Sequence, residues 1–210
     1  MIVSHRHKFI YFAVPKTATH TVRDALRPHL GPDDWEQQVL FGSQSSPIAE
    51  IAAIQHGHIT ANEIRPHFEP ADWDNYFKFG FVRNPYDRFV SVCFFLNRSN
   101  PDFAATAVDF MKQRLPRKRF QQRVLVRPQH TQLCIDGEVA LDFVGRYEEL
   151  QQSFDIICER IGIPSSELGF KNTSEHTSFV DYYNDDELRQ LVSDFYARDF
   201  RLFSYDLQLR

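Results

Sequence analysis

The alternation of apolar runs with amphipathic segments predicts an α/β fold. Short apolar runs at residues 9–14 and 77–82 are typical of buried strands, and a further strand is expected at 142–146. Segments with helical periodicity follow these runs, including residues 148–161 and 185–198. Because strands and helices alternate from end to end, the pattern predicts a mostly parallel central sheet flanked by helices.

Local signals predict weaker elements and several helix starts. Short strands are expected at residues 39–40 and 52–55. Thr60 is placed as an N-cap, with Glu63 three residues later completing a capping box. The sequence contains no internal repeat, low-complexity tract or linker, so residues 1–210 are interpreted as a single domain.

Composition and charge exclude several classes of protein. The 210 residues carry a formal net charge of −4, which does not favour nonspecific nucleic-acid binding. The three cysteines are odd in number and form no CxxC pattern, which argues against a disulfide framework or a zinc site. The chain lacks a signal-peptide layout and an apolar stretch of about 18 residues. We therefore expect a cytoplasmic protein that does not bind membranes.

The segment after the first strand has the features of an anion site. Lys16 and a series of small or hydroxylated residues lie between a strand and a helix, where backbone N–H groups point at a ligand. The alternative is a threonine-capped helix whose lysine is solvated. The glycines of the GxxxxGK[ST] loop are missing, which argues against an ordinary ATPase or kinase. The N–H groups expected to line the site belong to Thr17, Ala18, Thr19, His20 and Thr21.

The strand at residues 77–82 leads into a second candidate anion site. Asn84 is a good N-cap, and Pro85 suits the first helical position. Arg83 with Ser91 is predicted to hold a phosphate through a fork of donors and a hydroxyl. The alternative is a well-capped helix with an exposed arginine. Two such sites in a small protein suit a ligand with phosphates at two separated positions.

Four segments resemble the sulfotransferase family. PKTATHTV resembles the 5′-phosphosulfate loop of these enzymes, and RNPYDRFVS resembles their 3′-phosphate motif. QHGHIT and LDFVGRYEELQQSFDIICERIGI are similar to segments of the carbohydrate, uronosyl 2-O-sulfotransferase-like branch. The matched pieces lie between residue 9 and about residue 162. The resemblance implies a three-layer, P-loop-like α/β domain. Ala18, where many members have glycine, and His20 depart from the usual loop.

The resemblance also implies a donor and roles for the site residues. The co-substrate would be PAPS, with PAP as product and no metal. Lys16 would stabilise charge on the oxygen between sulfur and phosphate, and residues 17–21 would cradle the 5′-phosphate. Arg83 and Ser91 would hold the 3′-phosphate. A late loop often closes over the nucleotide, so Ser174 is expected to contact it, although an ordinary surface loop is an equal alternative.

The expected acceptor is a hydroxyl group, with a carbohydrate as the implied class. By the resemblance His58 is the first choice of general base, with His56 nearby for acceptor binding or as an alternative base. A metal-binding pair and a purely structural pair are the alternatives, and no third ligand of suitable spacing lies nearby. The rival functions are a divergent nucleotide kinase or hydrolase and a catalytically silent nucleotide-binding module. The acceptor's identity and the oligomeric state do not follow from the sequence.

Overall fold

The computed structural model describes residues 1–38, 45–169 and 178–209. The chain divides into two compact units. One, here called the sheet unit, comprises Met1–Val82 and Thr131–Lys171. The other, here called the helical unit, comprises Arg83–His130 and Asn172–Arg210. The strand at 77–82 and the motif that follows it therefore belong to different units, joined by the peptide bond after Val82.

The described residues of the sheet unit form a five-stranded sheet in the order β3-β1-β2-β4-β7. The strands are β1 (Ile2–Ser4), β2 (Phe9–Phe12), β3 (Trp35–Glu36), β4 (Phe77–Val82) and β7 (Phe143–Arg146). β2 pairs with β4 and β4 with β7 in parallel, whereas β1 is antiparallel to both β2 and β3. All strands of this sheet except β1 therefore run in one direction, which confirms a mixed α/β fold with a mostly parallel sheet; β5 (Cys134–Ile135) and β6 (Glu138–Val139) form a separate antiparallel pair.

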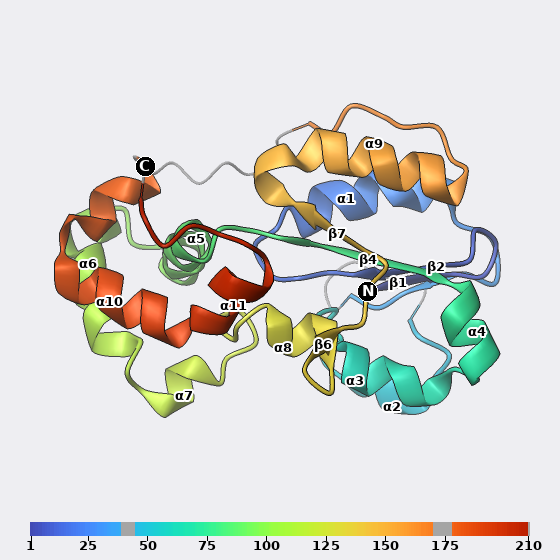
Figure 1. Cartoon of the computed structure of the whole chain (residues 1–210), viewed down its shortest axis with the longest axis horizontal. Helices are drawn as coiled ribbons and strands as arrows, with labels where there is room; N and C mark the ends of the chain where they lie inside the picture. Colours follow the sequence, from blue (N-terminus) through green and yellow to red (C-terminus); the bar gives the residue numbers. More distant parts are fainter. Residues whose placement is uncertain (39–44, 170–177, 210) are drawn as a thin grey trace. The chain divides into compact units, whose positions relative to one another are not determined.

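Alternate residues of the strands build the core of the sheet unit. Phe9 and Tyr11 of β2, together with Phe79 and Phe81 of β4, are fully buried and pack with α1 (Thr19–Leu26) and α9 (Leu150–Ile161). Burying each aromatic side chain contributes about 1.5–3 kcal/mol. Figure 1 shows α1 and α9 over one face of the sheet, and α3 (Ala61–Ile64) and α4 (Pro70–Asn75) over the other.

The helical unit packs its helices around an aromatic core. Its helices are α5 (Pro85–Leu96), α6 (Phe103–Arg114), α7 (Lys118–Gln121), α10 (Asp186–Phe195) and α11 (Ala197–Leu202). Tyr86 and Phe200 lie 4.8 Å apart between ring centroids, and Tyr86 and Tyr183 lie 4.6 Å apart. The single helix predicted at residues 185–198 is two helices, because Tyr196 leaves helical geometry at φ −102° and ψ 17°.

Most other local predictions are confirmed, and one is wrong. The capping box exists, since the Glu63 N–H donates to Thr60 Oγ1 at 3.1 Å and the Thr60 N–H to Glu63 Oε2 at 2.7 Å. The strand predicted at residues 52–55 is wrong: α2 (Ala49–Ala52) ends there in a turn, closed by the Ile54 N–H on the Ile51 carbonyl. The strand predicted at 39–40 lies outside the described residues. Over the three described ranges, no helix is long and apolar enough to cross a membrane.

Candidate active site

The first predicted anion loop joins β2 to α1 and presents backbone N–H groups. Ala18 is the N-cap of α1 in left-handed geometry, at φ 59° and ψ 33°, and no side chain caps the helix. The first bond along the helix runs from the Val22 N–H to the Ala18 carbonyl at 3.1 Å. The preceding N–H groups have no acceptor within the helix, and the dipole adds partial positive charge there. This end of α1 is therefore suited to an anion.

The loop holds two non-glycine residues in a strained conformation. Lys16 has φ 67° and Ala18 has φ 59°. Left-handed geometry costs a residue with a Cβ atom about 1–2 kcal/mol, and such strain is concentrated at functional sites. The buried Thr17 hydroxyl donates to the Val14 carbonyl at 2.9 Å and so stabilises the turn. Thr19 and Thr21 are also buried, whereas His20 is exposed.

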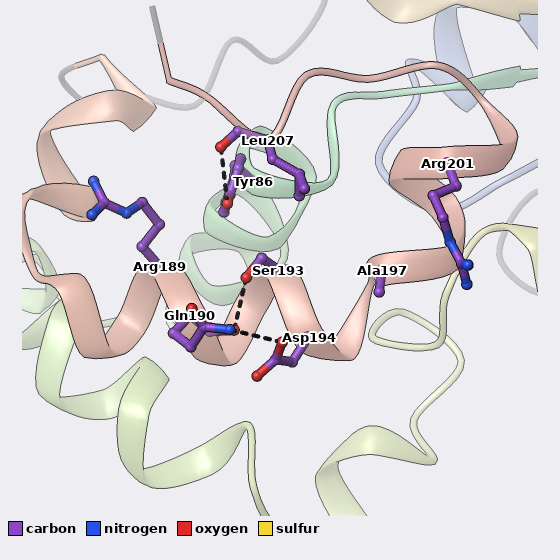
Figure 2. Close-up of a pocket in the computed structure, with 8 residues that line it drawn as sticks. All are labelled: Tyr86, Arg189, Gln190, Ser193, Asp194, Ala197, Arg201 and Leu207. Carbon is purple, nitrogen blue, oxygen red and sulfur yellow. Dashed lines mark hydrogen bonds between the residues drawn. The ribbon is translucent and has the colours of Figure 1, made fainter.

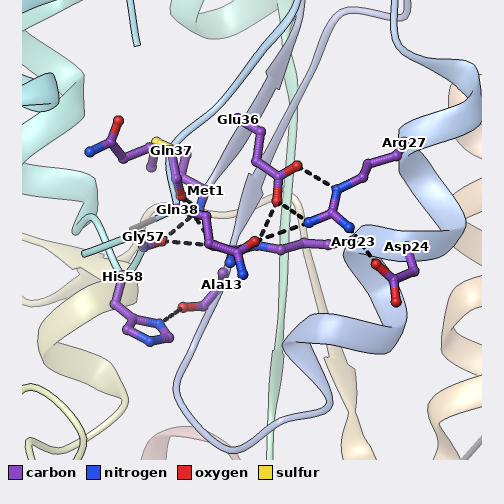
Figure 3. A network of polar contacts seen from close by, with 10 residues as sticks. All are labelled: Met1, Ala13, Arg23, Asp24, Arg27, Glu36, Gln37, Gln38, Gly57 and His58. Carbon is purple, nitrogen blue, oxygen red and sulfur yellow. Dashed lines mark hydrogen bonds and ion pairs between the residues drawn. The ribbon is translucent and has the colours of Figure 1, made fainter. Parts of the chain in front are cut away.

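His58 lies against the start of this loop in a defined tautomer. Its Nδ1 atom is 2.6 Å from the carbonyl oxygen of Ala13, three residues before Lys16 (Figure 3). A carbonyl can only accept, so Nδ1 carries the proton and Nε2 keeps its lone pair. Burial lowers the pKa of His58 to about 3. The ring is therefore neutral at physiological pH, with Nε2 able to accept a proton.

His56 has the opposite arrangement of ring nitrogens. Its Nδ1 atom accepts the backbone N–H of His58 at 3.3 Å, so in the neutral ring Nε2 carries the proton. The two rings have centroids 6.0 Å apart. In the neutral rings, Nε2 of His58 is therefore an acceptor and Nε2 of His56 a donor. The sequence alone did not separate the two histidines in this way.

A buried polar network lies behind the His-Gly-His segment (Figure 3). Arg23 of α1 donates through Nη2 to the carbonyls of Gly57, at 3.2 Å, and Gln37, at 3.3 Å. Its Nε atom lies 3.4 Å from Glu36, which also pairs with Arg27 at 2.7 Å. The amino nitrogen of Met1 is 2.5 Å from the Gly57 carbonyl oxygen. Sequence reasoning missed this network, since no motif marks Arg23 or Glu36.

Gly57 and Gln132 complete the support of His58. A Cβ atom on Gly57 would lie 2.2 Å from the Gln37 carbonyl oxygen and 2.5 Å from Arg23 Nη2, so no larger residue fits. Gln132 of α8 (His130–Leu133) donates to the carbonyls of Ala13, at 3.1 Å, and Ile59, at 3.2 Å. The acceptor of the His58 ring is thus itself held by a buried amide, which the sequence did not indicate.

The second predicted anion site begins the helical unit, and Arg83 there is buried. The alternative of an exposed arginine is wrong, because only 7% of Arg83 is accessible. Its Nε and Nη2 atoms each donate to a carboxylate oxygen of Asp87 at 2.7 Å. Asn84 caps α5 by accepting the Tyr86 N–H at 3.0 Å, as predicted, and Ser91 is buried on the same helix.

Gln129, outside the motif, holds the Arg83 backbone, and Asp199 in turn holds Gln129 and His130. The side-chain amide of Gln129 accepts the Arg83 N–H and donates to the Arg83 carbonyl, both at 2.9 Å. Asp199, fully buried, accepts the backbone N–H groups of Gln129 at 2.7 Å and His130 at 2.9 Å. It also lies 2.6 Å from Nδ1 of His130. None of these residues was predicted, because their contacts join distant parts of the chain.

Arg88, the second arginine of the motif, bonds the protein's own backbone. Arg88 is fully buried, and its guanidinium donates to the carbonyls of Leu125, Val126 and Arg127 at 3.1, 3.4 and 2.5 Å. It also stacks over the Tyr196 ring, with 5.4 Å from Cζ to the centroid. Arg88 therefore fixes the backbone of residues 125–127.

One predicted site residue is not described by the structure. Ser174 and its neighbours at 170–177 lie outside the described residues. Within the described part of the chain, no group of three or more His, Cys, Asp or Glu side chains is arranged to hold a metal.

The helical unit also holds a pocket of about 370 Å³, drawn in Figure 2, whose lining includes Tyr86 but none of the predicted site residues. It is lined by Tyr86, Arg189, Gln190, Ser193, Asp194, Ala197, Arg201 and Leu207.

Comparison with known proteins adds one extensive match. The sequence model of the family described as "Sulfotransferase family" matches residues 1–206. A protein from Archaeoglobus fulgidus, described as uncharacterized, is 29% identical over 84 residues, which are 40% of this chain and 66% of that protein. The chain thus spans just under two thirds of the length of this curated relative. No solved structure matches the chain significantly.

Proposed function

Because the chain belongs to the sulfotransferase family, we propose that it transfers a sulfuryl group from PAPS to a hydroxyl of a carbohydrate acceptor. The observation that carries this proposal is the 2.6 Å hydrogen bond from His58 Nδ1 to the Ala13 carbonyl. It holds a base with an available Nε2 atom at the start of a lysine-bearing anion loop. The His-Gly-His segment supports a uronosyl 2-O-sulfotransferase-like branch, and the β2–loop–α1 order supports a P-loop-like fold.

The residues of the first loop fit the 5′ end of such a donor. The first turn of α1, which no side chain caps, supplies backbone N–H groups for phosphate oxygens. The left-handed geometry of Ala18 turns the chain into this helix. PAPS supplies the sulfuryl group when bound. Lys16 is assigned the role of stabilising negative charge on the departing phosphate oxygen, a task for which a compact ammonium is suited. Thr17 through Thr21 form the cradle in this proposal.

His58 is assigned the removal of the acceptor proton. Its Nδ1–H is engaged with Ala13, so the proton from the acceptor hydroxyl goes to Nε2. The donor nitrogen of His56 is placed to orient the acceptor oxygen rather than deprotonate it. Anionic charge bound at the loop favours the protonated imidazole, so the pKa of His58 is expected to rise from about 3 when the loop is occupied.

Arg83 and Ser91 are assigned the 3′-phosphate. A guanidinium provides donors along two edges, and one edge of Arg83 faces Asp87. The carboxylate fixes the plane of the arginine, and Gln129 fixes its backbone. The arginine is therefore held in one orientation before any ligand arrives, which reduces the entropy cost of binding.

A thermal-shift comparison of PAP, AMP, ADP and ATP with magnesium tests the donor. A ligand that binds the folded chain raises the unfolding temperature by mass action. We expect selective stabilisation by PAP, lost in Arg83→Ala and retained in the exposed control Arg117→Ala. A preference for magnesium-ATP, or no response to PAP, would contradict the proposal and favour a kinase-like or silent protein.

A transfer assay tests the reaction itself. PAPS carrying radioactive sulfur, incubated with a panel of uronic-acid and neutral oligosaccharides, should give a labelled product with at least one acceptor. The product should be absent with His58→Gln. Tight PAP binding without product from any acceptor would instead favour a silent nucleotide-binding module.

A further inference from the structure

Arg23 places a buried guanidinium directly behind the histidine segment (Figure 3). Only 2% of the residue is accessible, and Nη2 donates to the carbonyls of Gly57 at 3.2 Å and Gln37 at 3.3 Å. Gly57 is the residue between His56 and His58. We propose that Arg23 is a positioning residue: it holds Gly57 and thereby aims the His58 ring. This inference rests on the proposed function, in which His58 is the base.

The stability of the fold does not explain a charge at this position. Removing a guanidinium from water is costly, and a buried ion pair is often no more stabilising than apolar residues of the same size. Among the described residues, Arg23 Nε has no hydrogen-bond partner. Glu36 is already held by Arg27, at 2.7 Å and 3.0 Å, so Arg23 is not needed to neutralise it. Arg23 differs from Arg27 in that its guanidinium donates to the backbone carbonyls of Gly57 and Gln37.

The packing around Gly57 transmits the position of Arg23 to the histidines. A single added carbon on Gly57 would come within 2.5 Å of Arg23 Nη2, so backbone and guanidinium are already in close contact. The adjacent residue, His58, is bonded on its other side to Ala13. A shift of the guanidinium is therefore expected to tilt the ring or break its bond to Ala13.

The same helix also carries the first anion loop. Arg23 lies four residues, about one turn, after Thr19, the first residue of α1. One rigid element thus begins at the proposed donor site and holds the proposed base segment one turn later. Arg23 consequently sets the spacing between the Lys16 loop and His58, and a misplacement of about 1 Å can cost about 100-fold in rate.

The test compares Arg23→Met with Arg27→Met, a control at the C-cap of the same helix that also removes a partner of Glu36. The readouts are kcat, KM for PAPS, and the ¹⁵N NMR signals of the His58 ring recorded without substrate. For Arg23→Met we expect kcat to fall about 10–100-fold, with KM for PAPS within about threefold. The His58 signals should change from a pure Nδ1–H form to a mixture of tautomers. Arg27→Met should keep the wild-type His58 signals.

Each outcome decides whether Arg23 positions His58 or only contributes to the stability of the fold. Wild-type His58 signals in a folded Arg23→Met chain would overturn the inference, as would equal losses of kcat in both variants. If circular dichroism shows that Arg23→Met does not fold, Arg23→Lys replaces it, since lysine keeps the charge but lacks the fork. Unchanged His58 signals in Arg23→Lys would then overturn the inference.

The NMR readout also separates this inference from the proposed function. Because the signals are recorded without substrate, they report on the ring even in a chain that transfers no sulfuryl group. Altered signals in Arg23→Met, combined with a wild type that lacks transferase activity, would sink the proposed function and leave the Arg23 contact established. Normal transfer with unaltered signals would sink the positioning role alone.

Discussion

The two proposed anion loops look alike in sequence but are built differently. Each follows a buried strand, carries a basic residue and begins a helix. In the first, Ala18 starts α1 in left-handed geometry without a side-chain cap. In the second, Asn84 caps α5 and Arg83 is held by Asp87. The first loop therefore offers backbone N–H groups, whereas the second offers the side chain of one oriented arginine.

In the proposed function, this difference suits the two loops to different tasks. Backbone donors at a helix start are fixed before binding and respond to charge that develops at one point, which suits a reacting phosphosulfate. An arginine already paired with Asp87 is suited to recognition, because it discriminates a phosphate by geometry without taking part in bond breaking. Changes in the first loop should therefore affect rate, and changes in the second should affect affinity or stability.

The largest effect is expected from Lys16→Ala. Loss of a charge that stabilises the departing oxygen should lower kcat by about 10²–10³-fold, as for removal of other transition-state donors. The affinity for PAP should change much less, since the backbone cradle remains. Steady-state kinetics and PAP titration measure both quantities. Lys8→Ala, exposed in the turn between β1 and β2, is the control; an equal loss of kcat in both variants would contradict the assignment.

The next effect is on the pH dependence of stability, to which His58 of the sheet unit contributes. The pKa of His58 is about 3 in the folded chain, below its ordinary value of 6.5, because the ring is buried. The unfolded chain therefore binds more protons between these values, so stability is full above pH 6.5 and falls as the pH drops toward 3. The slope reaches about 1.4 kcal/mol per pH unit.

Urea unfolding at a series of pH values measures this slope. His58→Gln should flatten the curve below pH 6.5, because glutamine does not titrate. The control His67→Gln, at an exposed histidine, should keep the wild-type slope. A wild-type slope in His58→Gln would assign the acid sensitivity to other groups.

A smaller effect is expected from the cap that distinguishes the second loop. Asn84→Ala removes the acceptor of the Tyr86 N–H, which lies 3.0 Å away, and should destabilise the protein by about 1 kcal/mol. The exposed Asn75, at the last position of α4, offers a matched control, and Asn75→Ala should stay within about 0.5 kcal/mol of wild type. Equal midpoints in urea for the two variants would mean that α5 does not depend on its cap.

The sequence predicted those elements whose signals are local. Residues 77–82 are a strand and Asn84 is a cap because an apolar run, an asparagine and a proline act within a few residues of each other. β1 and β3 were missed because strands of two or three residues exist only through pairing, here Val3 with Trp35. The boundary after Val82 between the two units was not visible either, since the motif runs through it without a break.

The candidate site divides in the same way. The loop at Lys16 and the histidines were proposed as site residues from contiguous motifs. Arg23 and Gln132 were not, because Arg23 contacts Gly57, 34 positions away, and Gln132 contacts Ala13, 119 positions away. Glutamine and arginine carry no sequence signal for such contacts, so the residues that contact Gly57 and Ala13 become visible only when the chain is folded.

The smallest effect tests whether strain in the first loop serves the reaction. Ala18 has φ 59°, so Ala18→Gly should relieve about 1–2 kcal/mol of strain and lose about 0.4–1 kcal/mol to the greater freedom of the unfolded chain. The net gain of about 0–1.6 kcal/mol should raise the melting temperature by about 2–4 °C for each kcal/mol gained. Ala25→Gly, inside α1, should lower it instead. If Ala18→Gly is more stable and equally fast, the strain is incidental; if kcat falls while stability rises, the methyl group holds the loop in its reactive shape.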